Sequence, residues 1–124
     1  IQNYLQKAAQ SGFAPEQIIL AGFSQGGAMA MFAGLTMPNA CKHVICCSGY
    51  LTQPEYIEQH LVSPTPNLML MHGTLDPMVH FERALQSKRQ LEQWQITPTW
   101  HSYTMQHQMC THQIQDLIQW FGDL

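Results

Sequence analysis

The chain has 124 residues, of which 45% are hydrophobic and 10% charged, and five Lys and Arg against eight Asp and Glu give a formal net charge of −3. This much apolar material can build the core of one domain, so the composition excludes an intrinsically disordered protein. No basic patch typical of nucleic-acid binding is present, and the longest apolar stretch, residues 28–37, is far shorter than the ~20 residues of a membrane-spanning helix.

Hydrophobic spacing predicts helices and strands that alternate along the chain. The expected elements are a helix that ends near Gly12, a strand over 17–23, an apolar helix over 28–37, a strand over 43–48, a loop over 52–66 with one helical turn, a strand over 67–72, a helix over 81–94, a strand over 99–103 and a last helix over 114–121. This order predicts an α/β fold, with a mostly parallel sheet of about four strands covered by helices on both faces.

The four cysteines show no spacing typical of a disulfide framework. Cys46 and Cys47 are adjacent within a predicted strand, so their side chains should point to opposite faces of the sheet. Reduced thiols, and therefore a cytoplasmic protein, are expected.

The segment Gly22-Phe23-Ser24-Gln25-Gly26 fits the pattern G-x-S-x-G between a predicted strand and a predicted helix. A nucleophile elbow needs this context, because small residues two positions before and after the serine let the backbone turn sharply and expose the hydroxyl. The turn also places Ser24 at a helix amino terminus, where the backbone N–H of Gln25 is a candidate oxyanion donor. The alternative is a glycine-rich turn in which Ser24 only caps the helix, and the partners described next favour the nucleophile.

A nucleophilic serine needs a base, and the base needs a residue that orients it. Both partners of an elbow serine follow it in the order Asp, His, each beyond the end of a later strand. Only Asp76 meets this condition, because Asp116 lies in the last predicted helix and Asp123 beside the carboxyl terminus. Among the seven histidines, His107 lies just beyond the fourth predicted strand and is favoured as the base, with His112 as the alternative.

A metal site would use overlapping residues, such as Cys46 with Cys47, or His107 with Cys110 and His112. The chain contains neither C-x-x-C nor H-E-x-x-H. Cysteine in an apolar strand behaves as a small hydrophobe, so no metal is expected.

The loop over 52–66, together with Tyr50 and Leu51 before it, should border the entrance to the site. Tyr50 and Leu51 are therefore candidates for substrate binding. The alternative is that these residues only cover the sheet surface.

Three segments of the chain carry recognisable motifs: Ile18-Ile19-Leu20-Ala21-Gly22-Phe23-Ser24-Gln25-Gly26-Gly27-Ala28, Ser48-Gly49-Tyr50-Leu51 and His72-Gly73-Thr74-Leu75-Asp76-Pro77-Met78-Val79. In this order they resemble the nucleophile segment, the segment after the next strand and the acid-bearing motif of the phospholipase/carboxylesterase family, which includes the acyl-protein thioesterases. The resemblance runs over essentially the whole chain.

The resemblance implies an α/β-hydrolase-type fold and hydrolysis of carboxylic esters or thioesters through an acyl-enzyme, with Ser24 as nucleophile, Asp76 as orienting acid and His107 as base. It implies no metal or organic cofactor. Small esters, lysophospholipids and acylated proteins are the expected substrates, without nucleic-acid partners or membrane insertion. One departure is Gln106-His107-Gln108 where the family usually has Gly-His-Ser, which would alter the loop around the base.

Family members carry several strands before the segment at which this chain begins, including a loop resembling His-Gly-x-Gly that supplies a second oxyanion donor. The chain is therefore expected to be a single partial domain (residues 1–124), the C-terminal portion of an α/β-hydrolase with its N-terminal strands missing. The strand over 17–23 would then be a sheet edge with unpaired backbone groups. Pairing is expected with the missing N-terminal half, in a longer parent protein or a cleaved companion, or with a second copy as a homodimer.

The alternative function class is a catalytically silent α/β-hydrolase fragment. Such a pseudo-enzyme would keep the elbow for packing and would act as a binding or dimerisation module.

Overall fold

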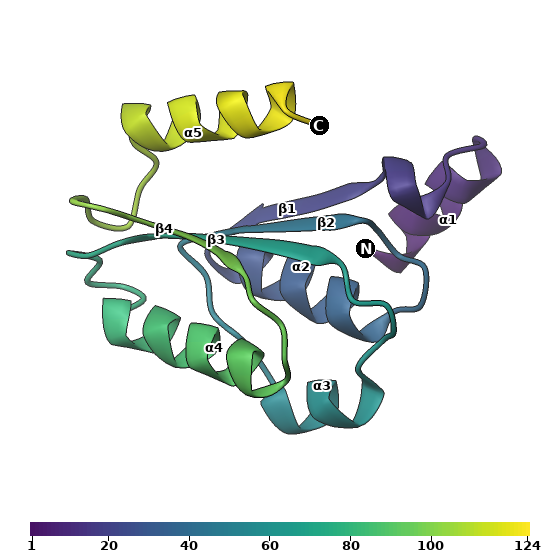
Figure 1. Cartoon of the computed structure of the whole chain (residues 1–124), viewed down its shortest axis with the longest axis horizontal. Helices are drawn as coiled ribbons and strands as arrows, with labels where there is room; N and C mark the ends of the chain where they lie inside the picture. Colours follow the sequence, from purple (N-terminus) through teal and green to yellow (C-terminus); the bar gives the residue numbers. More distant parts are fainter.

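The computed structural model describes residues 1–124, and its helices and strands alternate in the predicted order (Figure 1). The helices are α1 (Gln2–Gln10), α2 (Gln25–Thr36), α3 (Pro54–His60), α4 (Phe81–Gln93) and α5 (Thr111–Gly122), and a short 3₁₀ helix lies at Pro15–Gln17. The strands are β1 (Ile19–Phe23), β2 (His43–Cys47), β3 (Asn67–Gly73) and β4 (Thr99–Tyr103). None of the helices combines the length and apolar character that crossing a membrane requires.

The strands pair in chain order, β1-β2-β3-β4, and every pair is parallel. Right-handed crossovers that advance in one direction put their helices on the same face of a sheet. Accordingly, α2, α3 and α4 lie below the sheet in Figure 1, whereas α5, which follows the last strand, lies above it. The predicted parallel α/β sheet with helices on both faces is confirmed.

Each face of the sheet builds its own hydrophobic core. The core under α2, α3 and α4 includes Met31, Ile57 and Leu91, whose side chains are fully buried. Cys46 belongs to this core and Cys47 to the one under α5, as the alternation of side chains along a strand predicts. All four cysteines are free. The second core consists of Ile45, Cys47, Met69, Met71, Tyr103 and Met105.

The element boundaries differ from the sequence-based expectation by up to three residues. The strand expected from residue 17 begins at Ile19, because Pro15 starts a 3₁₀ helix that extends to residue 17. The helix expected from residue 28 begins at Gln25, since the two glycines that follow it adopt helical backbone without contributing to a hydrophobic pattern. The helical turn in the loop over 52–66, which the sequence places at about 56–61, begins at Pro54, because proline suits the first turn of a helix.

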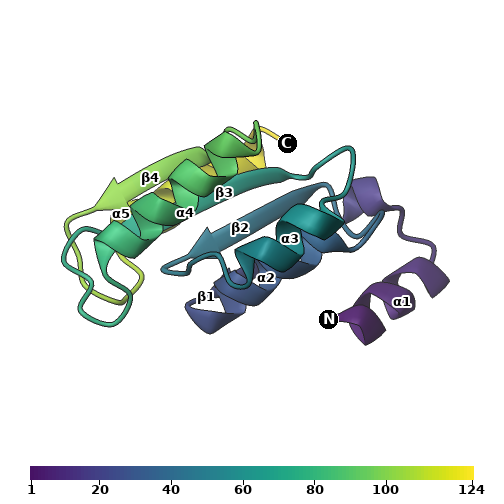
Figure 2. The same ribbon diagram turned by 90° about the horizontal axis from the view of Figure 1, so that it is seen from below.

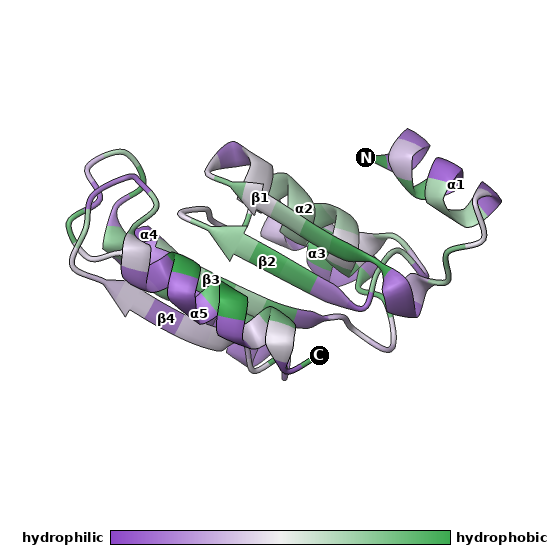
Figure 3. Cartoon of the chain, turned by 90° about the horizontal axis from the view of Figure 1, so that it is seen from above, coloured by the Kyte–Doolittle hydropathy of each residue, from purple (hydrophilic) through white to green (hydrophobic).

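The strand β1 forms an open edge of the sheet, as predicted, with β2 as its only neighbour. Ala21 and Phe23 on this strand are exposed, and Figure 3 shows hydrophobic colouring along it. Helix α1 lies beyond this edge and buries none of its residues (Figure 2). The edge therefore presents unpaired backbone groups and apolar side chains to solvent.

We expect two copies of the chain to associate through β1, because an apolar strand edge with free N–H and C=O groups favours pairing. Ala21→Lys adds a charge that a paired edge would have to bury, so this variant should shift the chain toward monomer in sedimentation velocity over a range of concentrations. Gln10→Lys adds the same charge on exposed α1 and should leave the sedimentation unchanged. A wild-type chain that remains monomeric at every concentration would contradict this expectation.

Candidate active site

A predicted site residue follows the carboxyl end of three of the four strands. Ser24 directly follows β1, Asp76 follows β3 by three residues, and His107 follows β4 by four. Parallel strands end at a common edge, so these residues meet although they are far apart in the sequence.

Ser24 lies on a turn that is too tight for a side chain at Gly22. A Cβ added at Gly22 would lie 2.2 Å from the carbonyl carbon of Gly26, whereas a Cβ at Gly26 would meet nothing within 4 Å. Ser24 itself has φ 58° and ψ −121°, a conformation that costs a residue with a side chain about 1–3 kcal/mol. Two backbone hydrogen bonds hold it there, from its own N–H to the Cys47 carbonyl (2.8 Å) and from the Ala28 N–H to its carbonyl (3.1 Å).

The Asp76 carboxylate is fully buried, and hydrogen bonds reach both of its oxygens. Oδ1 accepts from the backbone N–H groups of Met78 (2.8 Å) and Val79 (2.9 Å), and Oδ2 accepts from Nδ1 of His107 (2.7 Å). Burial alone would raise the pKa of Asp76, but the hydrogen bonds from His107 and from the two backbone groups lower it below its ordinary value of 3.8. The carboxylate is therefore ionised at neutral pH and can stabilise a positive charge on His107.

The imidazole of His107 bridges the other two residues. Its Nδ1 faces the Asp76 carboxylate, which can only accept, so Nδ1 carries the proton. Its Nε2 lies 3.0 Å from Oγ of Ser24 and is free to accept the hydroxyl proton. The ring centroid lies 4.8 Å from that of Phe23, so the side chain that precedes Ser24 packs against the imidazole.

The loops that carry Asp76 and His107 pass very close to each other at the end of β3. A Cβ added at Gly73 would lie 2.3 Å from the carbonyl oxygen of Met105 and 2.5 Å from that of Gln106. Glycine at position 73 is what permits this approach. Gln106 replaces the glycine of the family pattern while His107 stays within hydrogen-bond distance of both partners.

The other predicted polar groups are placed as follows. Gln25 is the first residue of α2, so its backbone N–H, next to Ser24, has no acceptor within the helix. His112 is the second residue of α5 and has 75% of its side chain exposed, so the alternative base lies on the surface. The structure brings no group of three or more His, Cys, Asp or Glu side chains together as a metal site.

Tyr50 and Leu51 follow β2 at the same edge of the sheet as Ser24. A Cβ at Gly49 would lie 3.0 Å from the Ser24 carbonyl oxygen, so the segment that leads to Tyr50 contacts the elbow. The Arg83 guanidinium lies over the Tyr50 ring, with Cζ 3.7 Å from its centroid, and Leu51 packs against the core under α2, α3 and α4. The roles of Tyr50 and Leu51 in substrate binding stay predictions.

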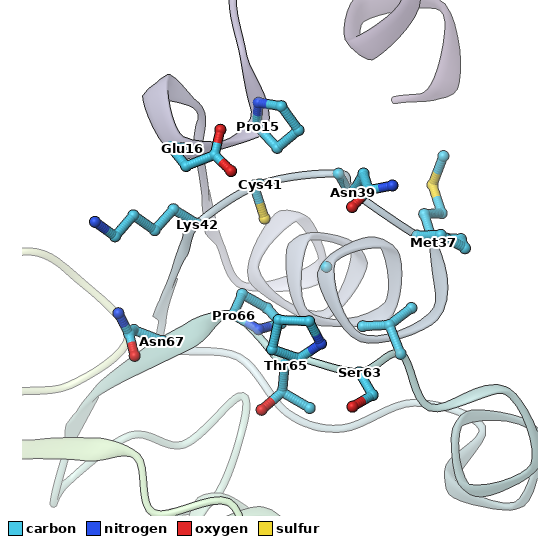
Figure 4. Close-up of a pocket in the computed structure, with 15 residues that line it drawn as sticks. Pro15, Glu16, Met37, Asn39, Cys41, Lys42, Ser63, Thr65, Pro66 and Asn67 are labelled. Carbon is cyan, nitrogen blue, oxygen red and sulfur yellow. The ribbon is translucent and has the colours of Figure 1, made fainter.

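A cavity of about 470 Å³ lies at the opposite end of the sheet. Figure 4 shows Lys42, which precedes β2, and Asn67, which begins β3, among the residues that line it. A five-residue strand such as β2 spans about 16 Å, so this cavity is too far away to hold a group that reacts at Ser24.

The two glycines of the elbow should respond differently to alanine. Gly22→Ala forces a Cβ into the backbone of Gly26 and should lower the free energy of unfolding by about 3 kcal/mol. Gly26→Ala enters open space in the first turn of α2 and should raise that free energy by up to about 1 kcal/mol, because alanine favours helix. Urea unfolding followed by circular dichroism measures both, and equal losses would contradict the tight turn.

Ionised Asp76 should stabilise the fold in a pH-dependent way. Because folding lowers the pKa of Asp76, the stabilisation is present above its ordinary value of 3.8 and is lost as the pH falls through the lower folded value. In unfolding experiments from about pH 7 to about pH 2, Asp76→Asn should flatten the decline of the unfolding free energy on the acid side. Asp123→Asn, at the exposed end of the chain, should leave that decline intact, and an identical decline in Asp76→Asn would contradict the prediction.

Comparisons with known proteins identify the family to which the chain belongs. The sequence profile of the phospholipase/carboxylesterase family matches residues 1–122. Acyl-protein thioesterase 1 of Gibberella zeae is 35% identical over 106 residues, which cover 82% of this chain and 45% of that protein. Acyl-protein thioesterase 1 of Neurospora crassa is 30% identical over 117 residues, which cover 90% of this chain and 48% of that protein.

The crystal structure of esterase PE8 superposes with a TM-score of 0.89 at 29% sequence identity, covering 98% of this chain and 57% of that one. The chain thus spans about half the length of the curated relatives it matches. The profile match over residues 1–122, together with this superposition, shows that the chain has an α/β-hydrolase-type fold and belongs to the phospholipase/carboxylesterase family.

Proposed function

We propose that the chain carries the catalytic centre of a serine hydrolase that cleaves carboxylic ester or thioester bonds. The hydrogen-bonded array of Ser24, His107 and Asp76 supports this proposal, with 3.0 Å from Oγ to Nε2 and 2.7 Å from Nδ1 to Oδ2. Proton transfer requires heavy-atom distances of about 2.6–3.2 Å, a range that both contacts meet. The names of the relatives, acyl-protein thioesterase and esterase, support the same bond class.

In the proposed reaction, Nε2 of His107 takes the proton of Ser24 while Oγ attacks the acyl carbon. The backbone N–H of Gln25 stabilises the oxyanion, and the Asp76 carboxylate stabilises the protonated His107. His107 then gives its proton to the leaving alcohol or thiol, and the acyl group stays on Ser24. Water, deprotonated by the same nitrogen, releases the acid and restores the serine.

Small esters, lysophospholipids and acylated proteins all contain a bond that this chemistry cleaves. The acyl-protein thioesterase relatives favour acylated proteins, and we propose that Tyr50 and Leu51 border the acyl group. We also propose that residues 1–124 are one part of a larger α/β-hydrolase domain, completed along β1 by a longer parent protein, a cleaved companion or a second copy. The open edge of β1 and the half-length match to the relatives support this arrangement.

A fluorophosphonate probe should label the wild-type chain at Ser24, because an activated serine attacks its phosphorus atom. Ser24→Ala should abolish labelling, and Asp76→Asn should slow it about 10⁴-fold. Ser48→Ala is the matched control: Ser48 follows β2, has φ 55° and carries a buried hydroxyl without a hydrogen-bond partner, so its loss should leave labelling unchanged. Labelled gels and intact-protein mass spectrometry measure the rates.

A catalytically silent domain that binds or dimerises through β1 is the second candidate, and the open edge of that strand favours it. The wild-type chain would then remain unlabelled, both alone and after fusion to the remaining half of the Gibberella zeae relative. Labelling that appears only in the fusion would instead support a catalytic centre that needs the additional chain. That chain would supply a second oxyanion donor, and such a donor increases the rate about 10²–10³-fold.

A further inference from the structure

We propose that His72 is a positioning residue that holds the Asp76 carboxylate in the orientation in which it binds His107. The inference rests on the function proposed above and adds a residue to that site. His72 lies on β3, where the preceding residues, 68–71, are all apolar, and only 2% of its surface is exposed. An imidazole in such a strand requires a polar partner.

The polar partner of His72 is the loop that carries Asp76. Nε2 of His72 lies 2.7 Å from the carbonyl oxygen of Val79 and 3.5 Å from Oδ2 of Asp76. Both neighbours are acceptors, so Nε2 carries a proton and donates it to the Val79 carbonyl. The carboxylate is at the limit of hydrogen-bond distance and experiences this N–H as a nearby partial positive charge.

Val79 links the imidazole to the carboxylate, because both of its backbone groups are engaged. Its carbonyl accepts from His72, and its N–H donates to Oδ1 of Asp76 at 2.9 Å. With Oδ1 fixed in this way, Oδ2 is directed at Nδ1 of His107. Removing the imidazole would leave the carbonyl of buried Val79 without this donor, a cost that the loop can relieve only by moving.

The hydrogen bond can be separated from packing, since the His72 ring also lies 6.2 Å, centroid to centroid, from that of Phe81. His72→Phe keeps an aromatic ring and removes the donor. His72→Gln places an amide N–H near the position of Nε2, whereas His72→Asn is one carbon shorter and does not extend to Val79. The Gln and Asn variants are matched in polarity, so comparing these two variants tests the role of the hydrogen bond even if His72→Phe does not fold.

The first readout is the rate of fluorophosphonate labelling at Ser24. His72→Asn and His72→Phe should slow labelling about 10- to 100-fold, because a displaced carboxylate no longer orients His107, and His72→Gln should restore most of the rate. His43→Phe removes another buried imidazole, at the far end of β2, and should label like the wild type. Thermal unfolding verifies that each variant is folded at the assay temperature.

The second readout does not depend on catalysis. A proton held between Nδ1 of His107 and the Asp76 carboxylate gives a far-downfield ¹H resonance. We expect this resonance in the wild type and in His72→Gln, and its loss in His72→Asn and His72→Phe.

The two readouts distinguish failure of this inference from failure of the proposed function. A wild-type chain that is never labelled contradicts the proposed function, and the resonance then decides the role of His72. Selective loss of the resonance in His72→Asn supports positioning, and its persistence in both His72→Asn and His72→Phe overturns it. Absence of the resonance from the wild type also overturns it, because no ordered bond to His107 would exist to be positioned.

Discussion

Hydrogen bonding between parallel strands in a fixed register is the constraint on which the site depends. It aligns the carboxyl ends of β1, β3 and β4, so that Ser24, Asp76 and His107 lie close together beyond these strand ends. The strand β2 carries none of these residues but separates β1 from β3. Neighbouring strands lie about 4.8 Å apart, so the serine and the carboxylate belong to strands about 10 Å apart, a gap that one imidazole spans with hydrogen bonds of 3.0 and 2.7 Å.

Close backbone contacts at two glycines then set the positions of the residues that the sheet brings together. Gly22 and Gly73 each occupy a place at a strand end where a Cβ would collide with backbone. Gly22 allows the tight turn at Ser24, and Gly73 allows the loop that carries His107 to cross the end of β3. Electrostatics completes the arrangement, because burial raises the pKa of the Asp76 carboxyl whereas the hydrogen bonds donated to it lower that pKa below its ordinary value. The same donors that stabilise its charge also set its direction.

The two edges of the sheet differ in a way that bears on assembly. The strand β4 contains Thr99, His101 and Ser102, and such a polar edge discourages pairing with another strand. The strand β1 is apolar and has its outer side open, and Ser24 lies directly after its end. A strand that paired with β1 would therefore lie next to the elbow that carries Ser24.

The sequence by itself determined the order of elements, the parallel α/β architecture, the elbow and the strand-end positions of Asp76 and His107, because hydrophobic periodicity and turn residues are local properties of the chain. It did not distinguish Gly22 from Gly26, which are equivalent in the motif, and it gave no role to His72. Only the tertiary structure decided these points. Collision of a Cβ and donation to a carbonyl seven residues away both depend on the path of the backbone in three dimensions, which no local pattern records.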